Sequence, residues 1–176
     1  MSTLNMKKPL KIVLCGEGGV GKTSIAFRFT KGVFYETIKI TVGIEHFTKI
    51  VKIDGKEVKI VLWDLGGEER FRFLAPVFLK GAKGGVFVFD VTREETFLKL
   101  EEWYSIYRQQ VGDSPAVLVG NKIDLEEFRV ILRDHAEKYA KSKGFIGYYE
   151  VSAKNNVNIE KPFIDLIKCI LSKESS

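Results

Sequence analysis

Short apolar runs alternate with stretches of helical periodicity along the chain. Several of these runs are continuously apolar, which is typical of parallel strands covered on both faces. The pattern predicts an α/β fold, a mostly parallel sheet with helices on both faces. The runs are LKIVLC (10–15), VKIVLW (58–63), GGVFVFDV (84–91), PAVLVG (115–120) and GYYEV (147–151).

One edge of the sheet is expected to be antiparallel. The segments 44–53 and 56–63 are separated by Asp54-Gly55, a two-residue hairpin signal. The two segments are therefore predicted to pair directly with each other.

The helices have recognisable ends in the sequence. Thr92 and Glu95 have the spacing of a capping box and predict a helix from there to about residue 110. Gly144 is expected to end the helix of 135–143. The last helix carries apolar residues at helical spacing, and Pro162 falls in its first turn, where a missing N–H costs little.

Composition is that of one soluble globular domain, expected to span residues 1–176. Apolar residues make up 45% and charged residues 29% of the chain, and the net charge is +5. The densest basic cluster is Lys49, Lys52, Lys56 and Lys59. It is read as the solvated face of the hairpin, with an acidic partner or an anionic membrane surface as the alternative. No aromatic-basic interleaving accompanies the charge, so no nucleic-acid partner is expected.

The sequence predicts a cytoplasmic monomer without a stable membrane anchor of its own, peripheral at a membrane only through partners. Cys15 and Cys169 are far apart in apolar runs and read as free thiols in a reducing compartment. No run has the length of a membrane span. The string CILS (169–172) resembles a prenylation box but does not end the chain. His46 and His135 are isolated and suggest no metal cluster.

Residues 16–23 read GEGGVGKT and match G-x-x-x-x-G-K-[ST] between a predicted strand and a predicted helix. Glycines let the backbone N–H groups point at a phosphate, and the helix N-terminus adds partial positive charge. Lys22 is expected to reach the outer phosphates, and Thr23 to offer its hydroxyl to Mg²⁺. The predicted nucleotide contacts here are Gly16, Glu17, Gly18, Gly19, Val20, Gly21, Lys22, Thr23 and Ser24.

The segment NKID (121–124) indicates that the base is guanine. Guanine presents N1–H and an amino group side by side, and the carboxylate of Asp124 can accept from both. Adenine has an acceptor at N1 and no amino group at C2, so it would leave that carboxylate unpaired. Unpaired buried polar groups make such discrimination large.

Other residues are expected to complete the base site. Asn121 is predicted to brace residues 16–23, and the stem of Lys122 to cover the ring. SAK follows another strand and supplies Ser152, Ala153 and Lys154. The backbone N–H of Ala153 is expected to meet guanine O6.

D-x-x-G at residues 64–67 ends another predicted strand. Asp64 is expected to hold Mg²⁺ through water, and the N–H of Gly67 to contact the γ-phosphate. Thr41 is placed to add a hydroxyl to Mg²⁺ when the γ-phosphate is present; the alternative is an ordinary strand-edge threonine. Lys22, Thr41, Gly67 and Glu68 form the predicted catalytic set.

The order GEGGVGKT, Thr41, DLGG, NKID, SAK resembles the Ras-like small GTPases over nearly the whole chain. WDLGGEERFR and LAPVFLKGA resemble the Rab branch, and the paired glycines of DLGG are similar to the Arf branch. The resemblance implies a P-loop NTPase G domain with a six-stranded sheet, five helices, and Mg·GTP or Mg·GDP as ligands. It also implies switch I at about 34–44 and switch II at about 64–78, segments that meet effectors, exchange factors and GTPase-activating proteins.

The same resemblance assigns roles to aromatic residues. Phe34 matches the aromatic that lies against the guanine. Trp63 and Phe78 match two members of the aromatic triad that Rab proteins present to effectors; the third falls on His46, with Phe47 one residue further. Ordinary packing is the alternative for these aromatic residues. Rab proteins end in a tail with prenylated cysteines, which is not found in this sequence; either a stable membrane anchor is not expected, or the tail has been cut or replaced.

Glu68 stands where the family usually has a glutamine that orients water. An ionised glutamate can only accept hydrogen bonds. It could still orient the water, or pair with Arg70, Arg72 or Lys80 and leave hydrolysis to a partner's arginine, for which Gly18 leaves room. The main interpretation is a GTP/GDP switch with slow Mg-dependent hydrolysis in Rab-like trafficking or signalling. The alternatives are a nucleotide-bound scaffold with negligible hydrolysis and, against the evidence of NKID and SAK, a P-loop kinase or ATPase.

Overall fold

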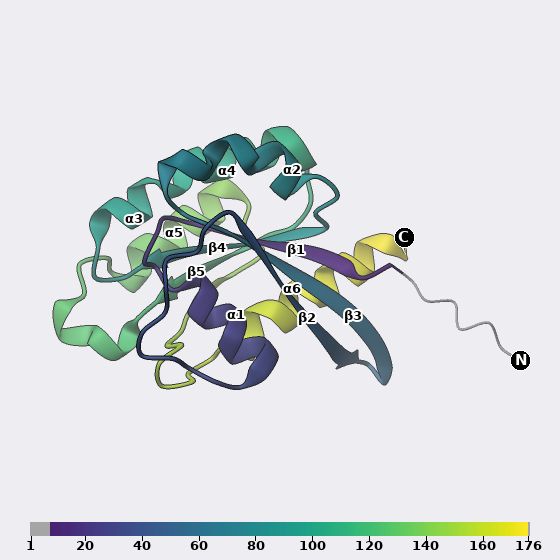
Figure 1. Ribbon diagram of the computed structural model, residues 1–176, viewed down its shortest axis with the longest axis horizontal. Helices are drawn as coiled ribbons and strands as arrows, with labels where there is room; N and C mark the ends of the chain where they lie inside the picture. The colour runs from purple at the N-terminus through teal and green to yellow at the C-terminus, as the bar shows by residue number, and fades with distance from the viewer. Residues whose placement is uncertain (1–7, 176) are drawn as a thin grey trace, which may run out of the picture.

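The computed structural model describes residues 8–175 and contains a six-stranded sheet with helices on both faces (Figure 1). The strand order is β2-β3-β1-β4-β5-β6. Only the β2–β3 pair is antiparallel among the described strands, and it lies at one edge. The α/β fold and the antiparallel edge strand predicted from the sequence are confirmed.

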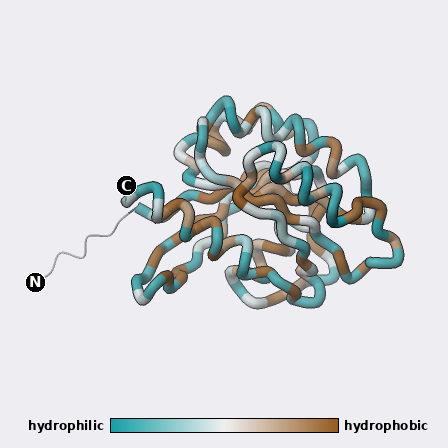
Figure 2. Tube along the Cα trace, turned by 180° about the vertical axis from the view of Figure 1, so that it is seen from behind, coloured by the Kyte–Doolittle hydropathy of each residue, from teal (hydrophilic) through white to brown (hydrophobic). Residues whose placement is uncertain are grey.

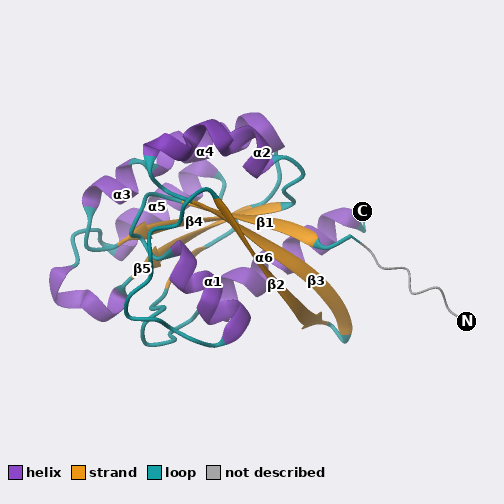
Figure 3. Ribbon diagram, viewed as in Figure 1, coloured by secondary structure: helices purple, strands orange, loops and turns teal. Residues whose placement is uncertain are grey.

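The strands are β1 (Leu10–Cys15), β2 (Ile44–Ile53), β3 (Lys56–Leu65), β4 (Gly84–Asp90), β5 (Ala116–Asn121) and β6 (Tyr148–Glu150). The helices are α1 (Lys22–Lys31), α2 (Ala75–Leu79), α3 (Glu94–Leu98), α4 (Leu100–Val111), α5 (Arg133–Lys143) and α6 (Glu160–Glu174). Two 3₁₀ segments are η1 (Glu69–Leu74) and η2 (Ile123–Phe128). As Figure 3 shows, α1 and α6 cover one face of the sheet and α2, α3, α4 and α5 the other.

The β2–β3 hairpin turns where the sequence predicts it. Asp54 and Gly55 have φ of 51° and 80°, the two consecutive positive values of a type I′ turn. Ile60 and Leu62 are fully buried on the face toward α1, while the neighbours of alternate parity remain accessible. The alternation of apolar and polar positions therefore sets which face of β3 is inside.

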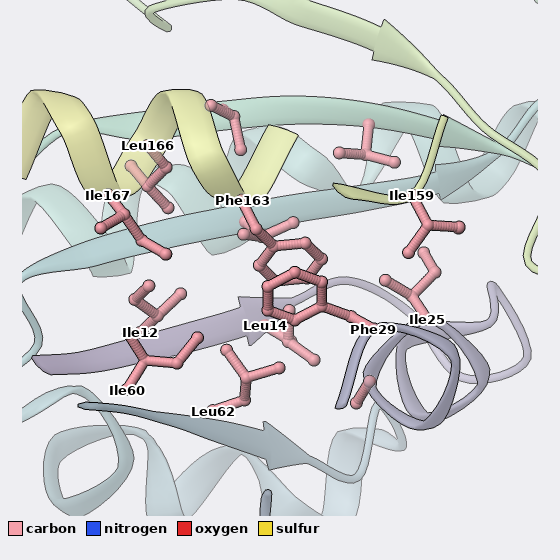
Figure 4. Close-up of a cluster of buried hydrophobic side chains, with 14 of the residues drawn as sticks. Ile12, Leu14, Ile25, Phe29, Ile60, Leu62, Ile159, Phe163, Leu166 and Ile167 are labelled. Carbon is pink, nitrogen blue, oxygen red and sulfur yellow. The ribbon is translucent and has the colours of Figure 1, made fainter. Parts of the chain in front are cut away.

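Apolar residues of the sheet and of the inner helix faces form the buried core, and the tube in Figure 2 is brown along the central strands. Between the sheet and α1/α6, the rings of Phe29 and Phe163 stack at 4.1 Å between centroids (Figure 4). On the other face, Trp103 and Tyr107 of α4 are buried with Phe78 of α2. These two cores fix the strands whose ends carry the polar motifs.

The predicted capping box is wrong. The N–H and hydroxyl of Thr92 both donate to Oδ1 of Asp90, at 2.9 and 2.6 Å, so Thr92 does not cap a helix. Asp90 is buried, and a buried carboxylate requires donors more strongly than an exposed helix end does. The helix begins instead at Glu94 and is divided at Lys99 into α3 and α4, which gives the described chain six helices where five are implied.

The other helix ends agree with expectation. Gly144 follows α5 with φ of 81° in the left-handed region, and Pro162 lies in the first turn of α6. Within residues 8–175, none of the helices combines the length and apolar character that crossing a bilayer requires. Cys15 and Cys169 are free thiols, and burial raises the pKa of Cys15.

Phe163→Ala is expected to lower the free energy of unfolding by about 3–5 kcal/mol, because it empties a fully buried ring position stacked on Phe29. Urea denaturation followed by circular dichroism measures this loss. Leu98→Ala, at a side chain 62% exposed, is the matched control and should change stability by less than ~0.5 kcal/mol. Equal losses in both variants would contradict the assignment of Phe163 to the core.

Candidate functional site

A cleft of about 630 Å³ opens where the loops that follow β1, β3 and β5 meet. Its size suits a small-molecule ligand, and the carboxyl ends of parallel strands are the usual place for one. Residues predicted from the sequence that line it are Gly18, Gly19, Gly21, Lys22, Thr23, Ser24, Phe34, Thr41, Gly67, Glu68, Asn121, Lys122, Asp124, Ala153 and Lys154. The other predicted site residues, Gly16, Glu17, Val20, Asp64 and Ser152, are not among the residues that line the cleft.

The loop of residues 16–23, the P-loop, connects β1 to α1. Lys22 is buried, and its Nζ donates to the carbonyl oxygens of Gly16 at 2.9 Å and Glu17 at 3.0 Å. An ammonium has three N–H donors, so one remains for a ligand in the cleft. Burial lowers the pKa of Lys22, and the nearby Asp64 carboxylate opposes that shift.

Three oxygen-bearing side chains converge beside Lys22. The hydroxyl oxygens of Thr23 and Thr41 lie 2.7 Å apart, and the Thr23 hydroxyl donates to Oδ2 of Asp64. Oδ1 of Asp64 is buried without a hydrogen-bond partner among the described residues. Burial raises the pKa of Asp64, while Lys22 and the Thr23 hydrogen bond oppose the shift. A hard cation such as Mg²⁺ takes oxygen ligands of this kind and would satisfy the unpaired carboxylate oxygen.

At the other end of the cleft, the Asn121 side chain joins two loops to the end of β5. Its Nδ2 donates to the carbonyl of Val20 at 2.9 Å, which shows the predicted brace on the P-loop. Its Oδ1 accepts the N–H of Ala153 at 3.2 Å. The backbone N–H of Ala153, which was expected to contact guanine O6, therefore donates to Asn121 in this structure. A Cβ on Gly21 would lie 2.3 Å from Nδ2 of Asn121, so the brace needs glycine there.

The base-reading residues are held by their neighbours. Oδ1 of Asp124 accepts the Ser152 hydroxyl at 2.8 Å, which orients the carboxylate at the rim of the cleft. Nζ of Lys122 donates to Gly19 O at 2.7 Å and lies 3.0 Å from Oδ2 of Asp90. Asp90 is a functional-site residue that was not predicted from the sequence. A carboxylate at the end of an apolar strand is the signal that would have found it.

Arg28 is a second supporting residue that the sequence did not reveal. Its Nε donates to Ala153 O and its Nη2 to Lys154 O, both at 2.9 Å, and its Cζ lies 5.8 Å from the ring centroid of Phe34. A single arginine near the end of α1 therefore fixes the SAK loop beside the aromatic residue. No local pattern marks it, because its partners are 125 and 126 residues away.

The paired glycines of DLGG allow close backbone approach. A Cβ on Gly67 would lie 2.2 Å from the nitrogen of Gly18, and one on Gly66 would lie 2.4 Å from the carbonyl oxygen of Thr41. The segment after β3 therefore contacts both the P-loop and the segment that carries Thr41. Glu68 lines the cleft and pairs with Arg70, Oε2 to Nε at 2.7 Å, which selects one of the three partners considered from the sequence.

The Ras family profile matches residues 11–172. Among similar proteins, Rab-21 of Dictyostelium discoideum is 40% identical over 170 residues, 96% of this chain and 80% of the relative. Human Rab-12 is 38% identical over 165 residues, 93% of this chain and 68% of the relative. Rab-10 of Diplobatis ommata is 38% identical over 164 residues, 93% and 82% of the two chains.

The chain belongs to the Ras family. Within it the similarity is to the Rab branch. This Ras-family protein is a small GTPase, an enzyme that binds guanine nucleotide and hydrolyses GTP, and it acts in trafficking or signalling. The family's activity gives no support to the alternative of a scaffold with negligible hydrolysis.

The aromatic effector surface expected for this Ras-family protein needs correction. Phe78 is fully buried under α4, and Phe47 is 7% exposed with its ring edge-on to Phe27 at 5.0 Å. Neither ring is presented to a partner, because each faces a core. Trp63 is half-buried. The His46 ring lies edge-on to it, with 4.3 Å between the ring centroids, and Nζ of Lys11 lies 3.4 Å from the Trp63 ring centroid.

Other apolar residues are exposed on the two switch segments instead. Exposed fractions are 69% for Ile40, 67% for Val42, 76% for Phe73 and 62% for Val77. These residues are not predictable from the sequence, because each occurs in a short segment without readable periodicity. Further cleft-lining residues that no sequence motif marks are Tyr35, Glu36, Ile38, Lys39, Ile40 and Leu125.

Gly66→Ala is expected to push the segments carrying Thr41 and Gly66 apart, because the new Cβ would meet Thr41 O at 2.4 Å. The N–H of residue 66, which donates to Gly43 O at 2.9 Å, should lose protection from amide hydrogen exchange by about tenfold. NMR-detected exchange measures this protection factor.

Gly84→Ala serves as the control for that substitution. The atoms nearest its Cβ would be side-chain atoms of Ile170 and Leu166 in α6, at 2.9 Å or more, and not the segment that carries Thr41. Unchanged protection of residue 66 in Gly66→Ala, or an equal loss in Gly84→Ala, would contradict the close approach.

Proposed function

We propose that residues 1–176 form one G domain that binds GTP or GDP with Mg²⁺, hydrolyses GTP slowly, and acts as a switch. The observation that carries this proposal is the convergence of Thr23, Thr41 and Asp64 beside Lys22, with one buried carboxylate oxygen that has no hydrogen-bond partner in the described part of the chain. Thr41 belongs to the segment 34–44 and Asp64 to 64–78. The presence or absence of the γ-phosphate can therefore change the conformation of both switch segments through this one cluster of side chains.

The phosphate end of the cleft would bind the nucleotide through charge and backbone donors. The P-loop amides and the α1 N-terminus face the phosphates, and the remaining N–H of Lys22 meets an outer oxygen. Thr23, Thr41 and Asp64 would hold Mg²⁺, which when bound offsets the negative charge of the β- and γ-phosphates. Gly67 packs on Gly18, where its N–H can reach the γ-phosphate.

The base end would read guanine. Asp124 accepts from N1–H and the exocyclic amino group, and Ser152 keeps its carboxylate in place. Phe34 and Lys122 line the same cleft and would flank the ring. Arg28 holds the SAK loop that carries Ala153.

Hydrolysis would require a water oxygen to attack the γ-phosphorus, which releases GDP and phosphate. We assign Glu68 the task of accepting a hydrogen bond from that water. Arg70 partly offsets its charge, but the carboxylate has no donor to offer the γ-phosphate. The intrinsic rate should therefore be slow, and a partner's arginine entering beside Gly18 would supply the missing donor.

Partners would read the switch segments. The exposed apolar residues Ile40, Val42, Phe73 and Val77 lie on these segments and suit effectors, exchange factors and GTPase-activating proteins. Trp63 remains a candidate contact at the margin of this surface. The proposed setting is a monomer in the cytoplasm that becomes peripheral to a membrane through such partners.

Asp124→Asn is expected to move nucleotide preference from GDP toward xanthosine diphosphate by about 100-fold or more, because an amide can donate to the C2 oxygen of xanthine. Competition between the two diphosphates measures the ratio. Asp165→Asn, whose carboxylate accepts from Tyr149 away from the cleft, is the matched control and should leave the ratio unchanged. An unchanged preference in Asp124→Asn would show that Asp124 does not read the base.

Glu68→Ala is expected to slow single-turnover GTP hydrolysis by about tenfold, because the water loses its acceptor. Glu68→Gln should be at least as fast as the wild type, since the amide adds a donor for the γ-phosphate. Rapid-quench measurements on GTP-loaded protein give the three rate constants.

Glu69→Ala is the control, because Glu69 is exposed one residue further along the chain. If wild type, Glu68→Ala and Glu68→Gln were equally slow, Glu68 would have no part in hydrolysis by the isolated protein. Removal of Mg²⁺ with EDTA should abolish turnover in the wild type, and metal-independent turnover would refute the metal site.

A further inference from the structure

Arg72 lies in η1, five residues after Gly67, and points away from the cleft toward α4. Its Nη2 lies 2.8 Å from Oε1 of Glu17 in the P-loop, and its Nη1 pairs with Oε1 of Glu102 in α4. Its guanidinium Cζ lies 5.1 Å from the ring centroid of Trp103. One side chain therefore connects switch II, the P-loop and α4.

Glu17 is held at both its backbone and its side chain. Its Oε1 accepts from Arg72 and from Nε1 of Trp103 at 3.3 Å. Its carbonyl oxygen accepts from Lys22, and a Cβ on Gly67 would lie 2.4 Å from its carbonyl carbon. Hence the same P-loop residue contacts switch II at Gly67 through the backbone and at Arg72 through the side chain.

Glu68, Glu69 and Arg70 lie between these two attachments and are the accessible part of the segment. Phe71 is buried and fixes η1 to the core beside α2. With Arg72 in place, the residues from Gly67 to Arg72 form a short span anchored to the P-loop at both ends. Such a span leaves Glu68 little freedom to move relative to the phosphates.

This contact differs from an ordinary surface ion pair. The side chains of Arg72 and Glu17 are only 16% and 21% exposed, whereas exposed pairs contribute little. Arginine presents its donors in a rigid planar fork, so its contacts to two carboxylates have a fixed geometry that the flexible ammonium of lysine does not impose. Among residues 8–175, Nε of Arg72 is buried and has no hydrogen-bond partner, so the contact leaves one donor unsatisfied.

We propose that Arg72 is a positioning residue for GTP hydrolysis. By bridging Glu17 and Glu102 it holds Gly67 and Glu68 against the phosphate end of the cleft, and it touches neither nucleotide nor water itself. The inference rests on the proposed function, because it assigns Arg72 to the geometry of the step in which Glu68 acts.

The test is single-turnover hydrolysis by Arg72→Gln loaded with GTP and Mg²⁺. The rate constant should fall by about tenfold, because small displacements of catalytic groups carry large rate penalties. The affinity for GDP should stay within about twofold, since Lys22, Thr23 and Asp124 are untouched. Amide exchange should rise at residues 66–71 and remain unchanged in β5 and α6.

Two further variants separate the tether from other effects. Arg133→Gln breaks an exposed arginine–glutamate pair on α5 and should change none of these quantities. Glu17→Gln combined with Arg72→Gln removes both charges; if the tether is what matters, the double variant hydrolyses GTP as slowly as Arg72→Gln alone. Recovery in the double variant would instead show that an uncompensated Glu17 charge caused the loss.

The outcomes distinguish this inference from the function on which it rests. A wild-type protein that hydrolyses GTP with Mg²⁺, and an Arg72→Gln variant that does so equally fast, would overturn the role of Arg72 alone. A global loss of exchange protection with weakened GDP binding would also overturn it, in favour of a purely structural role. A wild type that does not hydrolyse GTP would overturn both.

Discussion

The parallel register of β1 and β3 is the constraint on which the site depends. It places Asp64 opposite Leu14, so that a fully buried carboxylate lies beside the strand that runs into the P-loop. Lys22 is buried in the same region and carries the opposite charge. Neither group is stable in an apolar interior without polar partners. The Thr23 hydroxyl therefore donates to Asp64 and lies beside the Thr41 hydroxyl, and the P-loop carbonyls accept from Lys22. The cleft lies next to these groups.

Around this pair, the side chains of Asn121, Arg28 and Lys122 hold the P-loop and the SAK loop in place through hydrogen bonds. Asn121 joins the P-loop to the SAK loop, and Arg28 holds the latter from the side of α1. Lys122 ties Gly19 to the buried Asp90. Arg28 lies in α1, Asn121 ends β5, and Lys122 follows it directly, so all three side chains start from regular secondary structure or next to it. The ligand therefore meets a largely prepared surface, which reduces the ordering cost of binding.

Much of the fold was predictable because the information is local. Apolar runs mark β1, β4 and β5, Asp54-Gly55 marks the hairpin, and Gly144 marks the end of α5. The P-loop, DLGG, NKID and SAK are also contiguous, and the strand–loop context places them at one edge of the sheet. The structure brings most of the predicted contact residues into one cleft for that reason.

The remaining features depend on tertiary contacts that no short window contains. The capping box at Thr92 failed because Asp90, buried by the sheet, competes for the same hydroxyl. Phe78 could be aligned with an effector aromatic, but its burial depends on α4. Arg72 meets Glu17 across 55 residues, so its partner could not be selected from the sequence. Side chains that connect elements are thus the least predictable part of the site.

The β2–β3 hairpin also affects how copies of the chain behave toward one another. β2 has ten residues and, within residues 8–175, pairs with a neighbour on one side only, so its outer edge presents unpaired backbone donors and acceptors. Such an edge invites strand pairing between molecules, and lysines are a common protection against it. Lys49 turns inward to Phe29 O at 2.6 Å, while Lys52 stands exposed on this edge strand and Lys56 and Lys59 on its partner β3. Because two such edges would bring like charges together, the basic cluster opposes aggregation through the sheet even where no acidic partner or membrane is present.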